Sequence, residues 1–447
     1  MNNTGRPTQS WILCAFILVL WAGTSGYAQK AGADQDQLKL RIPTNDSFDG
    51  LNFIGGDAAY PPFSDTVLGE GSDFRRTLLR RGMALRIMVQ AQYAQNTLDA
   101  PVPPDDQVYL GQRPFESAFV EPILTANLHQ LRLRQSQLYV SGIWNWASWD
   151  PGGPKTFQIC NLYLYKEFDE GHITMKAGYM PNQLEFVGFF MGGSTAAGAE
   201  GAYLVLPYEV GMSYFPLTAP SLDVQIRASK NTYFKTGTQR SIDPNGGLAE
   251  VARNATGFRF RPHGDKVLSI NEGGFVRRAS AGTHEAWFRA GYIHNFTPYR
   301  SEITGRNDAS NYCAYALGDY QVSQPNRDHP SQGWYLGASA EATPETLNPY
   351  ARYLEGRIYK EAPFRSRPSD VASLDLSRTG YSRYFTGNLV AQGRTVSHGL
   401  TTLIGSYSLH VSPGNYLDAS LIYMSGPAIS PRTPNALNFS VAWTTFF

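Results

Sequence analysis

Five charged side chains stand out because they alternate with apolar neighbours at every second position. They are Arg86, Asp223, Arg227, Glu355 and Arg357. Carboxylates accept hydrogen bonds and guanidinium groups donate several at once, so these residues can replace the hydrogen bonds that a polar solute makes with water. On an extended strand their spacing puts them on one face. We expect that face to meet water.

Three tryptophans in the stretch GIWNWASWDP supply flat aromatic surface. Trp144 and Trp146 share a strand face with Leu138 and Val140, so we expect them at a membrane interface, where tryptophan is enriched. Trp149 has the opposite parity and leads into a loop. Its ring is therefore the candidate for stacking on a ligand.

One pair of residues has a spacing that could support catalysis. His410 and Ser412 would share a face on a strand, and an imidazole can activate a neighbouring hydroxyl. The turn-forming stretch Pro413-Gly414-Asn415 follows at once, and no strand-borne third residue orients the histidine. A hydrolase of membrane lipids stays an alternative, but we predict no catalytic residue, metal site or cofactor, because the eight histidines are scattered.

The elements that position these residues follow an export signal. Arg6 leads into an apolar stretch, Trp11 to Ala22, and the small-residue site Gly26-Tyr27-Ala28 ends a predicted signal peptide over residues 1–28. No later stretch reaches the length of a membrane-spanning helix without a charge or a Gly or Pro break. The net charge of +1 falls to about zero without the signal, so nothing favours a nucleic-acid partner.

Alternation of apolar and polar residues decides the fold class. It runs through Arg81 to Asn96, His172 to Tyr179 and Ser221 to Ala228, and the stretch Asp169-Glu170-Gly171 predicts a hairpin turn. Aromatic residues make up 13% of the chain, yet the mean hydropathy is −0.31. Strands with one face in lipid and the other in water have this composition.

The end of the chain reads as a strand that closes a barrel. Leu437, Phe439, Val441 and Trp443 share one face, and the chain ends on Phe447. A last strand that pairs with the first satisfies every backbone group in lipid, and barrel-assembly machinery recognises such aromatic ends. We predict an all-β transmembrane antiparallel β-barrel of ~16 strands over residues 81–447, wide enough for an aqueous channel, after a plug-like periplasmic segment at 29–80.

Four stretches resemble the OprB-type carbohydrate-selective porins. They are FRRTLLRRGMAL from Phe74, NLYLYKEFDEGHITMKAGYMPNQLEF from Asn161, QGWYLGASAEATPETLNPYARYLEGRIYKEAPFRSRPSDVASL from Gln332 and YLDASLIYMSGP from Tyr416. The chain departs from the pattern at Tyr179, where a basic residue is expected. The resemblance implies a monomeric barrel in the outer membrane that lets small sugars diffuse passively into the periplasm.

Under this resemblance the residues singled out above become candidates for lining a sugar channel. Sugars offer hydroxyls to charged groups and C–H faces to aromatic rings. The candidates are Arg86, Trp149, Asp223, Arg227, Glu355 and Arg357. A general diffusion porin and a polysaccharide export barrel remain alternatives, although residues 29–73 are too few for the helical repeats that usually precede an exporter. Cys160 and Cys313 are expected either to pair or to stay free.

Overall fold

The computed structural model describes Leu51 and residues 60–98, 102–152, 156–188, 191–192, 206–261 and 264–447. The predicted signal peptide, residues 1–28, lies outside the described residues, as does most of the predicted segment 29–80. Within the described part of the chain, no helix is long and apolar enough to cross a membrane.

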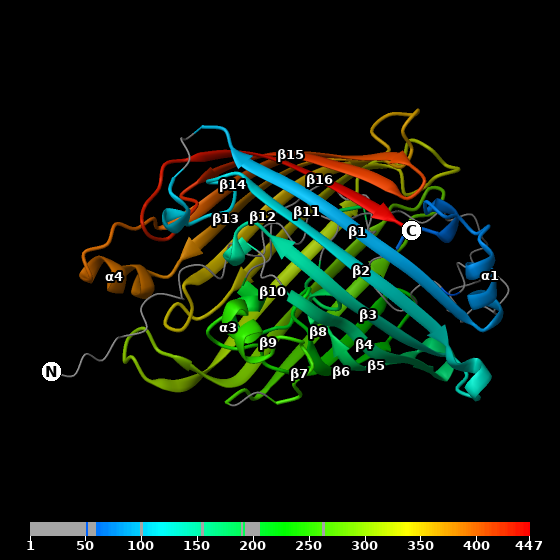
Figure 1. The fold of residues 1–447 in the computed structure, drawn as a ribbon, viewed down its shortest axis with the longest axis horizontal. Helices are drawn as coiled ribbons and strands as arrows, with labels where there is room; N and C mark the ends of the chain where they lie inside the picture. The colour runs from blue at the N-terminus through cyan, green and yellow to red at the C-terminus, as the bar shows by residue number, and fades with distance from the viewer. Residues whose placement is uncertain are drawn as a thin grey trace.

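Sixteen antiparallel strands form one closed barrel, as the sequence predicts (Figure 1). Each strand pairs with its neighbours in sequence and β16 pairs with β1, so no edge is left open. The strands are β1 Met83–Asn96, β2 Phe115–Asn127, β3 Ser136–Ala147, β4 Thr156–Phe168, β5 Ile173–Met180, β6 Ala219–Arg227, β7 Thr232–Arg240, β8 Val267–Arg277, β9 Ala286–Arg300, β10 Asn307–Gln321, β11 Gly333–Ala342, β12 Tyr350–Glu361, β13 Val371–Tyr381, β14 Gly399–Ser412, β15 Asn415–Ser425 and β16 Ala436–Phe446.

The two ends of the barrel differ in their connections. At the turn end, short segments such as 169–172 and 413–414 join the strands, and the C-terminus lies there with α1 (Figure 1). At the opposite loop end the connections are longer, above all 181–218 and 241–266. The α-helices are α1 Asp73–Arg80, α2 Leu206–Glu209, α3 Gly247–Arg253 and α4 Arg383–Ala391. Single 3-10 turns include η3 Phe63–Asp65, η4 Pro104–Asp106, η5 Leu128–Leu131, η6 Asp150–Gly152, η7 Asp169–Gly171 and η8 Asn182–Leu184, and η7 is the predicted hairpin turn.

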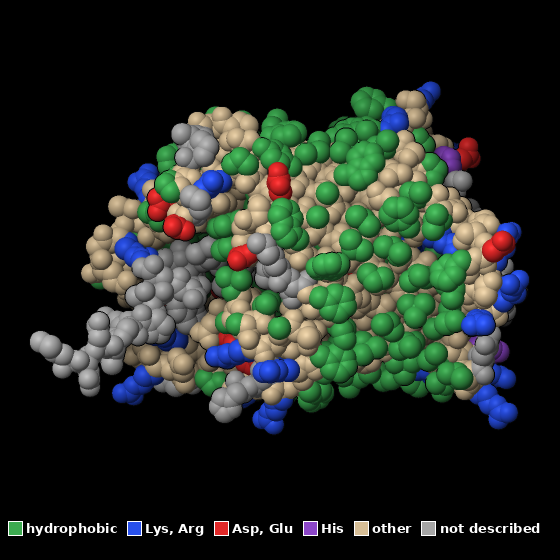
Figure 2. All heavy atoms as spheres, in the orientation of Figure 1, with side chains coloured by type: hydrophobic (Ala, Val, Ile, Leu, Met, Phe, Trp, Pro, Cys, Tyr) green, Lys and Arg blue, Asp and Glu red, His purple; other side chains and the backbone are tan. Residues whose placement is uncertain are grey.

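The alternation in each strand separates the outer face from the inner face of the barrel. In β1, Arg86 and Gln90 are buried inside, while Val89 between them faces outward. In β3, Trp144 and Trp146 are 70% and 43% exposed on the outer face, on the side predicted for them. Figure 2 shows apolar side chains spread over the middle of the outer surface and charged ones gathered toward the two ends. This distribution suits a barrel wrapped by lipid.

Pairing between the first and last strands closes the barrel. Residue Ala91 of β1 lies opposite Trp443 of β16. Beyond the end of β16, the backbone N–H of Phe447 donates to the carbonyl of Ile87 at 2.9 Å, and the N–H of Ile87 donates back at 3.2 Å. The predicted closing role of the C-terminal strand is confirmed.

Tyrosines on the inner wall lie over glycines of the neighbouring strand. A Cβ added to Gly274 of β8 would lie 2.2 Å from the ring of Tyr233 in β7, and one added to Gly291 of β9 would lie 2.3 Å from the ring of Tyr315 in β10. Only glycine lets the ring approach the backbone so closely. These contacts fix flat rings against the wall.

Both cysteines of the predicted mature chain are free thiols. Cys160 lies in β4 and Cys313 in β10, and each residue is 0% exposed. Of the two alternatives that the sequence left open, the structure therefore contains the unpaired one.

Candidate functional site

The described residues of the connection 181–218, namely 181–188, 191–192 and 206–218, enter the barrel, and we term them the inner loop. Within it, Phe186 and Val210 are 0% exposed and pack in one apolar cluster with Leu268 of β8 and Ile293 of β9. Those two wall residues face the interior, because neighbouring positions in their strands are exposed on the outside. The inner loop thus occupies part of the lumen and narrows it.

Two lysines hold the first part of the inner loop. The Nζ of Lys176 in β5 forms an ion pair with the Glu185 carboxylate, and the Nζ of Lys235 in β7 donates to the Glu185 carbonyl at 2.6 Å. The candidate Asp223 in β6 faces the same region, where the side-chain amide of Asn182 donates to it at 3.5 Å. The structure therefore places Asp223 beside the loop that narrows the pore.

Arg289 in β9 is the third cation that holds the inner loop. Its two terminal nitrogens donate to the carbonyl oxygens of Phe186 and Gly188, each at 2.6 Å. Sequence reasoning did not single out Arg289, Lys176 or Lys235. Strand parity could have shown that all three face inward, but it carries no signal for a loop that folds back onto them.

On β12, two predicted candidates lie together. One terminal nitrogen of Arg357 in β12 is 2.7 Å from the Glu355 carboxylate, and the other is 2.7 Å from the carboxylate of Asp319 in β10. The Arg357 side chain is 0% exposed and that of Glu355 is 1% exposed. A buried guanidinium between two carboxylates resists rearrangement, since removing one partner leaves an uncompensated charge. The group is a rigid part of the wall.

Charged side chains of both signs line the wall from β5 to β13. The cations that hold the inner loop come from β5, β7 and β9. Carboxylates come from β10 to β13, where each residue is less than a tenth exposed: Asp319, Glu341, Glu355, Glu361 and Asp375. One of them also reaches the inner loop, because the backbone N–H of Leu206 donates to Glu341 at 3.3 Å. Asp223 of β6 and Arg357 of β12 lie among these groups, so charges of both signs create local electric fields along this part of the wall.

The other three candidates lie elsewhere. Arg86 donates to the Pro61 carbonyl at 2.6 Å, and its guanidinium carbon lies 4.3 Å from the centre of the Phe63 ring. Arg227, the last residue of β6, is partly exposed at the turn end. Trp149 is partly buried against an apolar cluster at the loop end. The structure thus brings Glu355 and Arg357 together, sets Asp223 beside the inner loop and leaves these three apart.

Residues 60–82, the N-terminal segment, bind the turn end of the barrel. Asp65 accepts hydrogen bonds from His410 Nε2 at 2.9 Å, from the Gly414 N–H at 3.1 Å and from the Tyr416 hydroxyl. Burial opposes ionisation of Asp65, but the bonds from His410 and Tyr416 outweigh it and hold the pKa of Asp65 below its usual value. The ionised carboxylate therefore fastens the segment beside the closing strands.

This arrangement bears on the hydrolase alternative. The imidazole of His410 points to Asp65, whereas the Ser412 hydroxyl accepts a hydrogen bond from the Asn415 side chain at 3.1 Å. Ser412 is also the last residue of β14, directly before the turn that the sequence predicts. Among the described residues, the histidine serves to hold the N-terminal segment and does not form a hydrogen bond with the serine.

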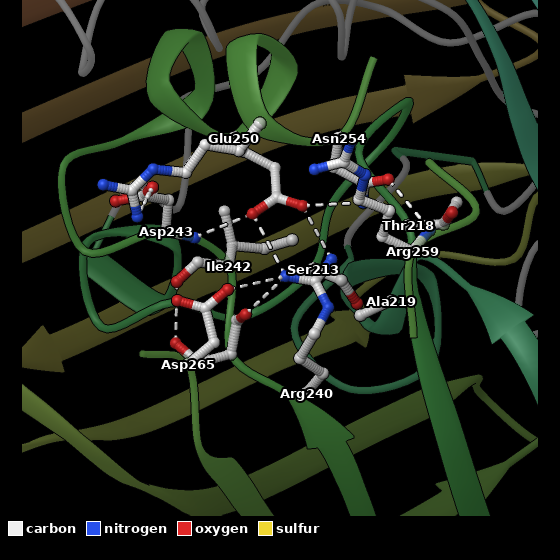
Figure 3. A network of polar contacts seen from close by, with 12 residues as sticks. Ser213, Thr218, Ala219, Arg240, Ile242, Asp243, Glu250, Asn254, Arg259 and Asp265 are labelled. Carbon is white, nitrogen blue, oxygen red and sulfur yellow. Dashed lines mark hydrogen bonds and ion pairs between the residues drawn. The ribbon is translucent and has the colours of Figure 1, made fainter. Parts of the chain in front are cut away.

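A polar network fixes the loop 241–266 at the loop end (Figure 3). Arg240 forms ion pairs with Glu250 of α3 at 2.7 Å and with Asp265 at 3.2 Å. Burial raises the pKa of Asp265 to about 6, although the charge of Arg240 opposes this. The backbone N–H of Ile242 donates to the Gly211 carbonyl at 2.9 Å, so this network also supports the inner loop.

Comparisons with known proteins agree with this architecture. A family model described as the carbohydrate-selective porin, OprB family, matches residues 137–447. The structure of Pseudomonas putida OprB at high pH is similar, with a TM-score of 0.72, 14% identity, and coverage of 87% of this chain and 100% of that chain. The low-pH structure of the same protein gives a TM-score of 0.55 at 13% identity, with the same coverage. No match was found among curated proteins.

Proposed function

The chain belongs to the OprB family of carbohydrate-selective porins, and from this premise we propose that it lies in the outer membrane and admits small sugars to the periplasm by passive diffusion. The family describes a channel, and we assign no catalytic residue. One observation carries the proposal. The inner loop narrows a closed 16-strand barrel between inward-facing cations and carboxylates.

This geometry suits a neutral polyhydroxy solute. Sugar hydroxyls both donate and accept, so they can exchange their water for the carboxylates and the N–H groups of the wall. Local fields at the wall orient such a dipolar solute without requiring a net charge on it. Solutes with a fixed net charge would be held by wall groups of the opposite charge, which slows their passage.

We assign the predicted pore residues different roles within this channel. Asp223, Glu355 and Arg357 belong to the narrowed region, because Asp223 lies beside the inner loop and the other two form an ion pair on the inner face of β12. Arg227 lines the lumen nearer the turn end. Arg86 holds the N-terminal segment and Trp149 lies at the loop end, so both act on the approaches to the narrow region.

The surroundings of the barrel follow from the same proposal. Residues 1–28 direct export, residues 29–80 form a periplasmic segment, and residues 81–447 form the barrel. The apolar outer surface contacts outer-membrane lipid, and assembly machinery recognises the aromatic end of the closing strand. The turn end then faces the periplasm. Outer-membrane fractionation and heat-modifiable migration on gels test this placement, and recovery in the soluble periplasm would refute it.

Transport by purified protein in liposomes tests the selectivity. Glucose should enter faster than lysine or glutamate, which are of similar size and carry a net charge, and its entry should saturate as the narrow region becomes occupied. Replacing both Asp223 and Glu355 with the corresponding amides should weaken this preference while the channel stays open. If entry depends on solute size alone and never saturates, the protein is a general diffusion porin.

A further inference from the structure

One tryptophan faces the interior of the barrel. Trp287 is in β9, two residues nearer the turn end than Arg289, and shares the inward face with it. Trp287 is partly exposed. Trp334 and Trp443 behave differently, because they are 42% and 41% exposed on the outer surface. Trp287 is therefore set apart from the membrane-facing tryptophans by its position.

Trp287 belongs to a connected aromatic and charged cluster. The guanidinium carbon of Arg289 lies 3.9 Å from the centre of the Trp287 ring. The indole N–H of Trp287 donates to the Tyr233 hydroxyl at 3.3 Å, and that hydroxyl donates to Glu272 at 2.8 Å. The hydroxyl of Tyr315 donates to the other oxygen of Glu272 at 2.9 Å. This series of contacts fixes the rings before any ligand arrives.

The same strands place polar groups around the two rings. Tyr233 of β7 is also partly exposed, and one side of its ring lies against Gly274. Asp319 of β10 is directly opposite Trp287 in the strand register. Rigid aromatic surface beside fixed carboxylates and a guanidinium is the combination that binds a sugar ring, through its C–H face and its hydroxyls.

We propose that Trp287 and Tyr233 form a sugar-binding subsite on the turn side of the narrowed region, a conclusion that rests on the proposed function. Arg289 links this subsite to the narrow region, because the guanidinium that lies over Trp287 also holds the inner loop. A sugar that has passed the loop therefore meets a second binding surface before it leaves at the turn end. In the sequence, the two-residue spacing of Trp287 and Arg289 on one strand indicates that both side chains share a face.

The test is block of single-channel ion current by glucose in planar bilayers. Trp287→Ala should raise the dissociation constant for glucose roughly three- to tenfold, the range expected for loss of an aromatic contact, and should leave the ion current open. Trp287→Phe keeps a ring and should retain most of the block. Trp334→Ala is the matched control on the outer surface and should match the wild type.

A second solute separates stacking from a change in pore width. Mannitol is a linear hexitol of nearly the same size as glucose but has no ring face, so its weaker block should not change in Trp287→Ala. Equal glucose block in wild type and Trp287→Ala would overturn the subsite and leave the proposed function standing. A wild-type channel that glucose never saturates would instead overturn the proposed function. Parallel loss of glucose and mannitol block would assign Trp287 a role in pore width and also overturn the subsite.

Discussion

Replacing Arg289 with Gln should loosen the inner loop while leaving the barrel closed. The arginine donates two charge-assisted hydrogen bonds to the carbonyls of Phe186 and Gly188. Each such bond contributes about 1.5–3 kcal/mol, so the pair contributes roughly 3–6 kcal/mol. The carbonyl groups freed by the substitution can bind water in the lumen, so we expect a loss of about 3 kcal/mol, the lower end of this range. A change of about 3 kcal/mol shifts the ratio of anchored to released loop by roughly a hundredfold.

Single-channel recording measures this change directly. Arg289→Gln should show a larger mean conductance and more current fluctuation than the wild type, and glucose should block it less. Lys176 and Lys235 still hold the start of the loop, so the effect should grow when Lys235→Met is added. The heat-modifiable band should stay, because these contacts lie inside the lumen and no strand pairing is removed.

Arg227→Gln is the matched control for charge. Arg227 also faces the lumen, and among the described residues its side chain makes no hydrogen bond to the inner loop. The control removes the same charge from the wall and should change ion selectivity without added current fluctuation. If the two variants change conductance and fluctuation equally, the effect of Arg289 is electrostatic, and the anchoring argument is wrong.

Three further predictions follow from single sites. Gly274→Ala should lower the unfolding midpoint in urea at a cost of about 1–3 kcal/mol, because its Cβ would meet the Tyr233 ring at 2.2 Å, whereas Gly273→Ala meets nothing within 4 Å and should fold normally. Burial raises the pKa of Glu209 in α2 to about 7, so this residue is ionised above that pH and neutral below it. As the pH is lowered from about 9 to about 5, cation selectivity, measured as a reversal potential, should fall. Glu209→Gln should remove the part of this fall that protonation of Glu209 causes. The pKa of Asp65 is lowered in the folded protein. Its stabilising contribution is therefore present above the usual pKa of an aspartate and is lost as the pH falls through the lowered pKa. Protease cleavage of the N-terminal segment should therefore rise in Asp65→Asn at neutral pH but in the wild type only below about pH 4.

Local alternation was enough to predict which residues face the lumen. In an extended strand successive side chains point to opposite faces, so the spacing of Arg86, Asp223 and Arg357 among apolar neighbours fixed their side of the wall. Lipid makes this signal strong, because a charge on the outer face near the middle of the membrane costs ~2–4 kcal/mol for Arg or Lys. The same rule predicted the outward positions of Trp144 and Trp146 and the closing role of the C-terminal strand.

What those inward residues contact depended on the tertiary structure. Arg289 binds carbonyls of residues about a hundred positions earlier, and no local pattern records where a loop returns into the barrel. Parity likewise gave Arg86 a place in the lumen but not its contact with Pro61, which depends on how the N-terminal segment docks. Side-chain direction is a property of each strand, whereas the narrowed pore arises from contacts between distant segments once the barrel has closed.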